Sequence, residues 1–135
     1  MKANLHEQLE VPLPEGFTVR GAEMGDIPEA LKLFNRWSQA VIHEDEITYA
    51  AAIRTEWVSP GFNPAEDIRL IFAPDGGMIG YVEVWTTQKP PVHPWIWSRV
   101  DPRYERLGLG EYLLAWAEGH ALKALDELPA DLRFA

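Results

Sequence analysis

The feature that most restricts the possible folds is residues 100–117, VDPRYERLGLGEYLLAWA, where a strand pattern gives way to a glycine-containing loop and then to a helix. A helix N-terminus leaves backbone N–H groups without partners, and its dipole favours an anion there. Gly108 and Gly110 lack side chains, so the backbone can approach a phosphate closely. Arg103 and Arg106 are near enough in sequence to add charge-assisted hydrogen bonds. The segment predicts a phosphate-binding loop, although two spaced glycines also occur in ordinary turns.

Periodicity along the rest of the chain predicts elements in the order β-α-α-β-β-β-α-β. The expected bounds are a strand at 17–20, helices at 27–41 and 47–57, strands at 68–73, 78–87 and 92–100, a helix from about Gly110, and a strand at 131–135. Asp26 is expected to cap the first helix, with Glu29 as its capping-box partner. The Asp75-Gly76-Gly77 tripeptide is a strong hairpin signal. The fold class is therefore α/β (α+β), with a mixed, mostly antiparallel twisted sheet flanked by helices.

The last helix has the clearest apolar stripe, which consists of Leu113, Leu114, Ala117, Ala121, Leu122 and Leu125. Residues 1–16 form a polar, proline-containing lead-in, and residues 17–135 form one domain. A chain of 135 residues is long enough to bury a core of its own.

Composition excludes several classes of function. The net charge of −9 repels a phosphate backbone, so we expect no nucleic-acid partner. The chain contains no cysteine, which rules out disulfides, thiolate metal sites and a cysteine nucleophile. No His, Asp and Glu spacing indicates a metal site, and no apolar run is long enough for a membrane helix. These features fit a cytoplasmic enzyme. The acidic surface either favours a cationic amine substrate or serves solubility alone.

Residues 100–110 and the following EYLLAWAE resemble the coenzyme A-binding motif of the GNAT family of N-acetyltransferases. In that family a strand ending in Val-x-Pro-x-Tyr leads to an Arg/Gln-x-x-Gly-x-Gly/Ala loop and to a helix that begins with a Leu-Leu pair. The order of elements resembles the family from Phe17 to Ala135. The resemblance implies an acyl-CoA N-acyltransferase-like fold and transfer of an acetyl group from the co-substrate acetyl-CoA to a small-molecule or peptide amine by direct attack.

The resemblance also implies which backbone groups bind the cofactor. The pyrophosphate would be bound by the amides of Arg106, Leu107, Gly108, Leu109 and Gly110. Ser98 and Val100 would pair through their backbone with the pantetheine arm. Glu105 stands where the family has Arg or Gln, and Arg106 stands where glycine is usual. We expect cofactor binding to survive in weakened form, because the loop acts mainly through main-chain N–H groups.

Two residues are candidates for the general base that this chemistry requires. His93 is the only titratable base near the expected position on the strand 92–100, and the alternative is a surface histidine after Pro-Pro. Glu83 alternates onto the same strand face as Tyr81 and Trp85, where burial would raise its pKa; the alternative is a solvent-facing carboxylate.

Other side chains near the expected site have two interpretations each. The acidic cluster 44–46 either selects a cationic acceptor or forms a solvated helix start capped by Asp45. Four tryptophans either form an aromatic wall for an apolar acceptor or belong to the core, and they are Trp37, Trp85, Trp95 and Trp97.

A complete family domain continues beyond residues 132–134 with another helix and two more strands, and that helix commonly supplies a tyrosine acid. We expect that this chain is part of a longer protein, such as a tandem of two such domains, or that its remainder has been lost. A second copy completing the sheet in a homodimer is the alternative, because the last strand would otherwise have an open edge. A non-catalytic acyl-CoA-binding or scaffolding role is therefore the alternative to acetyl transfer.

Overall fold

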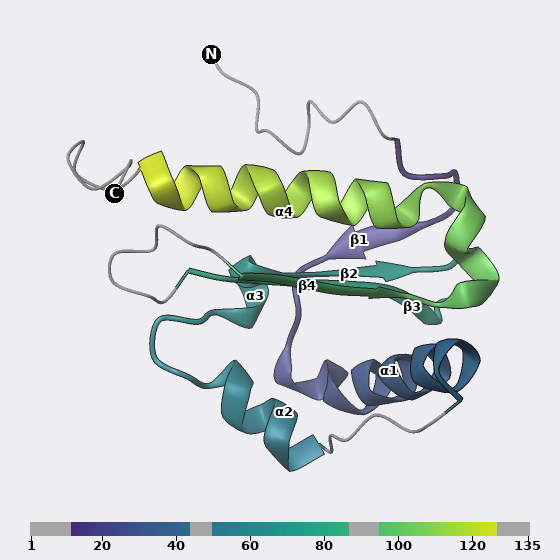
Figure 1. The fold of residues 1–135 in the computed structure, drawn as a ribbon, viewed down its shortest axis with the longest axis horizontal. Helices are drawn as coiled ribbons and strands as arrows, with labels where there is room; N and C mark the ends of the chain where they lie inside the picture. Colours follow the sequence, from purple (N-terminus) through teal and green to yellow (C-terminus); the bar gives the residue numbers. More distant parts are fainter. Residues whose placement is uncertain (1–11, 44–49, 87–94, 127–135) are drawn as a thin grey trace.

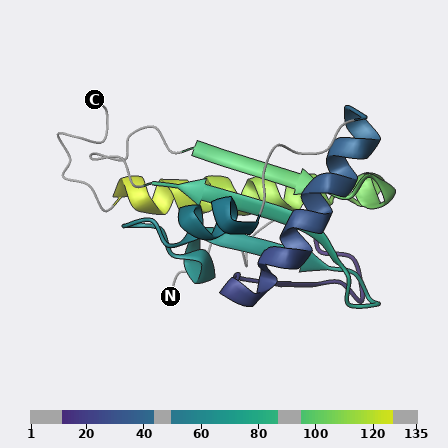
Figure 2. The same ribbon diagram turned by 90° about the horizontal axis from the view of Figure 1, so that it is seen from below.

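The computed structural model describes residues 12–43, 50–86 and 95–126, with the side chains of residues 125 and 126 excepted. A four-stranded sheet runs through it in the order β1 (Thr18–Arg20), β2 (Ile68–Phe72), β3 (Met78–Trp85) and β4 (Trp95–Val100). The helices of one face are η2 (Met24–Asp26), α1 (Ile27–Val41), α2 (Ala50–Trp57) and the short α3 (Pro64–Asp67). The opposite face is covered by α4 (Leu109–Asp126), which follows β4 through η3 (Pro102–Leu107) (Figures 1 and 2).

All three strand pairings are antiparallel. The predicted hairpin between β2 and β3 is confirmed: Gly77 N donates to Asp75 Oδ1 over 2.9 Å, and Ala73 N donates to Gly77 O over 2.9 Å. Gly76 has φ +91°, a conformation that favours glycine. The predicted strand at 131–135, which would follow the crossover helix, lies outside the described residues.

The sheet separates two apolar cores because alternate side chains of a strand point to opposite faces. Toward α1 and α2, Tyr81 of β3 packs with Phe34 and Trp57. Toward α4, Val82 of β3 packs with Leu113 and the neighbouring side chains of that helix. The central strand β3 is therefore covered on both sides, and its side chains are buried from Met78 to Val84.

Asp26 occupies the N-cap position of α1 as predicted, but the predicted side-chain cap and its capping box with Glu29 are wrong. Asp26 has helical backbone angles, and its side chain makes no capping hydrogen bond to α1. Its carboxylate instead accepts from the Arg20 guanidinium and from Glu23 N, which forms a capping box one turn earlier, at η2. Glu29 pairs with Lys32 over 3.3 Å. The chain thus enters α1 through an extra 3-10 turn that the sequence pattern did not reveal.

The predicted stripe of α4 is only partly correct. Leu113, Ala117 and Ala121 are buried as expected, but Leu114 and Leu122 are 47% and 55% exposed. Leu109 and Trp116 occupy the core positions instead. The buried face is therefore rotated relative to the prediction. Within the described ranges no helix is long and apolar enough to cross a membrane.

Candidate functional site

The strand β4 forms an edge of the sheet, since among the described strands only β3 pairs with it. Asp101 N donates to Ile79 O over 2.8 Å, which extends the antiparallel register of β3 and β4 by one pair. Backbone groups of alternate residues point to opposite sides of such a strand. The N–H and C=O groups of Ser98 and Val100 therefore point away from β3, toward the open edge.

The connection from β4 to α4 is more regular than the predicted glycine loop. After Asp101, the six residues Pro102–Leu107 form the 3-10 helix η3, and Gly108 follows with φ +77°. A residue with a Cβ pays a steric cost at this angle, so glycine is required for the turn into α4.

The start of α4 presents several backbone donors. Leu109 is fully buried and anchors this end in the core. The N–H of Tyr112 makes the first helical hydrogen bond, to Gly108 O over 3.0 Å, so the amides of Leu109, Gly110 and Glu111 precede the helical hydrogen-bond series. A Cβ added at Gly110 would meet no heavy atom within 4 Å. Internal packing therefore gives no reason for glycine here, since no protein atom crowds its Cβ position.

Arginines around this turn differ in their contacts. The guanidinium of Arg103 is directed to the carboxylate of Asp101, so its contacts in this structure differ from those expected for a pyrophosphate ligand. Arg106 and Glu105 are both exposed. An open cavity of about 770 Å³ lies between α1 and η3, and its lining includes Lys32, Arg36 and Arg103. This end of the molecule thus gathers positive side chains in a chain whose net charge is −9.

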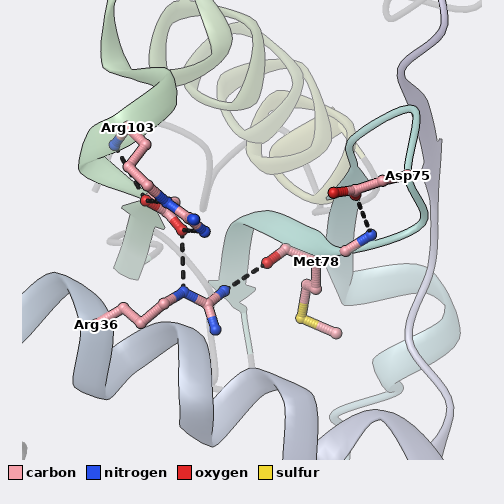
Figure 3. Close-up of polar contacts among 6 residues, drawn as sticks. Arg36, Asp75, Met78 and Arg103 are labelled. Atoms are coloured by element: carbon pink, nitrogen blue, oxygen red, sulfur yellow. Dashed lines mark hydrogen bonds and ion pairs between the residues drawn. The ribbon is translucent and has the colours of Figure 1, made fainter.

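Asp101 is the most enclosed charge near the loop, with a side chain that is 2% exposed. Its Oδ1 accepts from Arg103 N and Nε over 3.0 and 3.1 Å, and its Oδ2 accepts from Arg103 Nη2 over 2.8 Å and Arg36 Nε over 2.9 Å (Figure 3). Burial alone would raise the pKa of Asp101, but the hydrogen bonds from Arg103 and Arg36 outweigh it and hold the pKa at about 2. The carboxylate is therefore ionised at neutral pH.

Glu83 lies on the face of β3 that it shares with Tyr81 and Trp85, as predicted, and is 6% exposed. The Tyr81 hydroxyl donates to Glu83 Oε1 over 2.6 Å, and Trp85 Nε1 donates to Glu83 Oε2. Burial raises the pKa of Glu83, while these two hydrogen bonds partly offset the effect. The alternative of a solvent-facing carboxylate does not apply.

The tryptophans do not form one continuous wall. Trp97 packs edge-on against Phe34, with ring centroids 4.9 Å apart, whereas Trp95 is 53% exposed. Trp85 stacks on Phe62 at 4.0 Å. The guanidinium of Arg99 lies between two rings, 3.9 Å from that of Trp37 and 4.0 Å from that of Trp97. His93 and the acidic cluster 44–46 lie outside the described residues.

Comparison with known proteins agrees with this geometry. The profile of the acetyltransferase (GNAT) family matches residues 28–130. The chain belongs to the GNAT family. A search of curated proteins gave no match.

Solved structures of other GNAT proteins share the fold. A GCN5-related N-acetyltransferase from Sphaerobacter thermophilus is 25% identical, with a TM-score of 0.77 over 88% of this chain and 36% of that one. A phosphinothricin acetyltransferase from Sinorhizobium meliloti in complex with acetyl-CoA is 16% identical, with a TM-score of 0.61 over 80% of this chain and 60% of that one. The diaminobutyrate acetyltransferase EctA from Paenibacillus lautus, in complex with L-2,4-diaminobutyric acid and coenzyme A, is 13% identical. Its TM-score is 0.56 over 73% of this chain and 54% of that one. The chain thus spans about a third of the first of these proteins.

Two charged residues of this GNAT chain escaped the sequence analysis, namely Arg36 and Asp101. Asp101 directly precedes Pro102, which is a signal for a capped helix start. Arg36 lies outside the apolar face of α1, and nothing in the sequence indicates its partner, which is 65 residues away.

Proposed function

We propose that the chain is the acetyl-CoA-binding part of an N-acetyltransferase that transfers the acetyl group to a small amine. The observations that carry the proposal are the start of α4, where no protein atom crowds the Cβ position of Gly110, and the outer edge of β4, which no other described strand covers. Family membership and the acetyl-CoA complex of the Sinorhizobium meliloti protein support the choice of cofactor.

The pyrophosphate binds at the backbone amides of residues 106–110, of which those of Leu109 and Gly110 precede the hydrogen-bond series of α4, and the helix dipole favours an anion there. The pantetheine arm carries amide groups of its own and pairs with the backbone of Ser98 and Val100, whose N–H and C=O groups point to the open edge of β4. Leu107 and Leu109 contribute through their main chain.

In the transfer step, the acceptor amine attacks the thioester carbonyl carbon and the C–S bond breaks. The amine proton passes to a base, and coenzyme A leaves as a thiolate that is then protonated. Glu83 is our candidate for the base. Its pKa is raised toward neutral pH, which suits a general base. It pairs in register with Trp97 of β4, one strand away from the cofactor edge. His93 is the second candidate.

The acceptor is a cationic amine, since the chain carries a net charge of −9. The complex of the Paenibacillus lautus protein with diaminobutyric acid makes small diamines the first compounds to test. A non-catalytic acyl-CoA-binding domain is the second candidate function. It is favoured by the enclosure of Glu83, whose two oxygens already accept hydrogen bonds from Tyr81 and Trp85.

Calorimetry with acetyl-CoA tests the binding proposal. The wild-type chain should bind saturably, and Gly110→Glu should abolish binding without loss of fold, because no neighbouring atom obstructs the new side chain at its Cβ. Leu114→Glu is the matched control: it adds the same charge at an exposed position of α4 and should bind like the wild type. If Gly110→Glu bound acetyl-CoA as tightly as the wild type, the loop would not be the pyrophosphate site.

A thiol-release assay with small amines then separates the two functions. Release of coenzyme A that depends on the amine supports the acetyltransferase. Tight acetyl-CoA binding without release of coenzyme A supports the binding domain instead.

A further inference from the structure

We propose that Asp101 is a positioning residue for the cofactor, because Arg36 and Arg103 clamp it and it thereby holds η3 and the start of α4 in their binding arrangement. The inference rests on the proposed function, since it concerns acetyl-CoA affinity. Asp101 is buried beneath the turn and acts through the backbone of the loop.

Asp101 directly follows β4 and connects this strand to β3 and to η3. Its N–H donates to Ile79 O over 2.8 Å, which fixes it to β3. Its carbonyl accepts from Tyr104 N over 2.8 Å, and its Oδ1 accepts from Arg103 N over 3.0 Å, so it caps η3. The direction in which η3 leaves the sheet is therefore set at this one residue.

Arg36 connects the same carboxylate to a second layer of the molecule. Its Nε donates to Asp101 Oδ2 over 2.9 Å, and its Nη2 donates to Met78 O over 2.8 Å. Figure 3 shows Arg36 reaching from α1 and Arg103 approaching from the other side of the carboxylate. The turn after β4 cannot shift relative to α1 and β3 unless at least one of these charge-assisted bonds breaks.

Because η3 is short and regular, fixing Asp101 also fixes the position of the backbone amides proposed to bind the pyrophosphate. Between Asp101 and Gly108 lie only the six residues of η3, and Leu109 is then fixed in the core. Tyr104 packs edge-on against Phe17 with ring centroids 5.9 Å apart, which supports η3 from the outside. Backbone donors bind an anion well only when they are held in place beforehand, so a displacement at Asp101 should weaken pyrophosphate binding.

The test compares Asp101→Asn and Arg36→Gln with the wild-type chain, using two ligands. Acetyl-CoA contains the pyrophosphate, whereas S-acetylpantetheine lacks it; calorimetry measures the first, and NMR titration, which registers millimolar binding, measures the second. Arg20→Gln is the matched control, because Arg20 pairs with Asp26 through two hydrogen bonds of 2.8 Å on β1 and η2, away from the loop. All measurements are made at a temperature at which melting curves show each variant to be folded.

We expect acetyl-CoA affinity to fall about tenfold or more in Asp101→Asn and Arg36→Gln, as for misplacement of a binding group. The affinity of these two variants for S-acetylpantetheine should not change. The control Arg20→Gln should bind both ligands as the wild type does. Unchanged acetyl-CoA affinity in both variants, or an equal loss for both ligands, would overturn the positioning role while leaving the proposed function intact. Absence of acetyl-CoA binding by the wild type would overturn both.

Discussion

The hydroxyl of Tyr81 donates a hydrogen bond to Oε1 of Glu83 over 2.6 Å, inside the core between β3 and the helices α1 and α2. The two residues are two positions apart on one strand and so share a face. Burial raises the pKa of Glu83, and the Tyr81 hydroxyl is the strongest influence that lowers it again. This pair therefore sets the pH range in which a carboxylate exists at the candidate site.

Removal of the hydroxyl by Tyr81→Phe should raise the pKa of Glu83 further, because burial is then offset only by the hydrogen bond from Trp85 and the charge of Arg99. If Glu83 is the base, the rate falls as the pH drops through its pKa. The acidic limb of the kcat/KM profile should therefore move to higher pH in the variant, as measured by thiol release. An acidic limb that stays in place would exclude Glu83 as the titrating base.

Glu83→Gln should change the pH dependence of stability. A carboxyl whose pKa is raised on folding binds more protons in the folded than in the unfolded state between the ordinary value of 4.5 and the raised value. The free energy of unfolding therefore decreases in the wild type as the pH rises through that interval. Urea denaturation at a series of pH values should show this decrease in the wild type and a flatter curve in Glu83→Gln. Identical slopes would contradict the raised pKa.

The pKa shift of Asp101 should make stability depend on pH in the opposite direction. Its pKa is about 2 in the folded chain against an ordinary 3.8. A shift of this size corresponds to about 2 kcal/mol of stability, present above pH 4 and lost as the pH falls toward 2. Asp101→Asn should therefore be less stable than the wild type at neutral pH by roughly 2 kcal/mol and should lose this acid sensitivity. Denaturant titrations between pH 7 and pH 2 measure both effects, and a wild-type stability that does not change between pH 4 and pH 2 would argue against the low pKa.

Gly21 lies at the end of β1 directly against α3, where an added Cβ would be 2.1 Å from Ala65 O. Since the obstructing atom is backbone, Gly21→Ala should destabilise the fold by about 3 kcal/mol. Gly25→Ala is the matched control, because a Cβ at Gly25 meets nothing within 4 Å. Thermal melting should show a large decrease for the first variant and little change for the second. Similar melting temperatures would mean that β1 and α3 are not packed this closely.

The sequence predicted the elements whose signals are local. The helix that ends at Val41, the strands β2, β3 and β4 and the turn at Gly76 follow from side-chain periodicity and turn chemistry. The start of α1 at Ile27 agrees with the prediction, but its predicted side-chain cap is wrong, because Asp26 binds Arg20 instead of the first turn of α1. The short helix α3 was missed, since four residues are too few for a periodic signal.

The candidate site likewise has a part that local sequence signals predict and a part that depends on tertiary packing. By itself the sequence determined the glycine turn and helix start at Gly108 and Gly110, because a short segment encodes both. Only the tertiary structure brought Asp101 to Arg36 across 65 residues and enclosed Glu83 in the core. A motif depends on neighbours along the chain, whereas the charge state of a carboxylate depends on burial and on donors that packing brings to it.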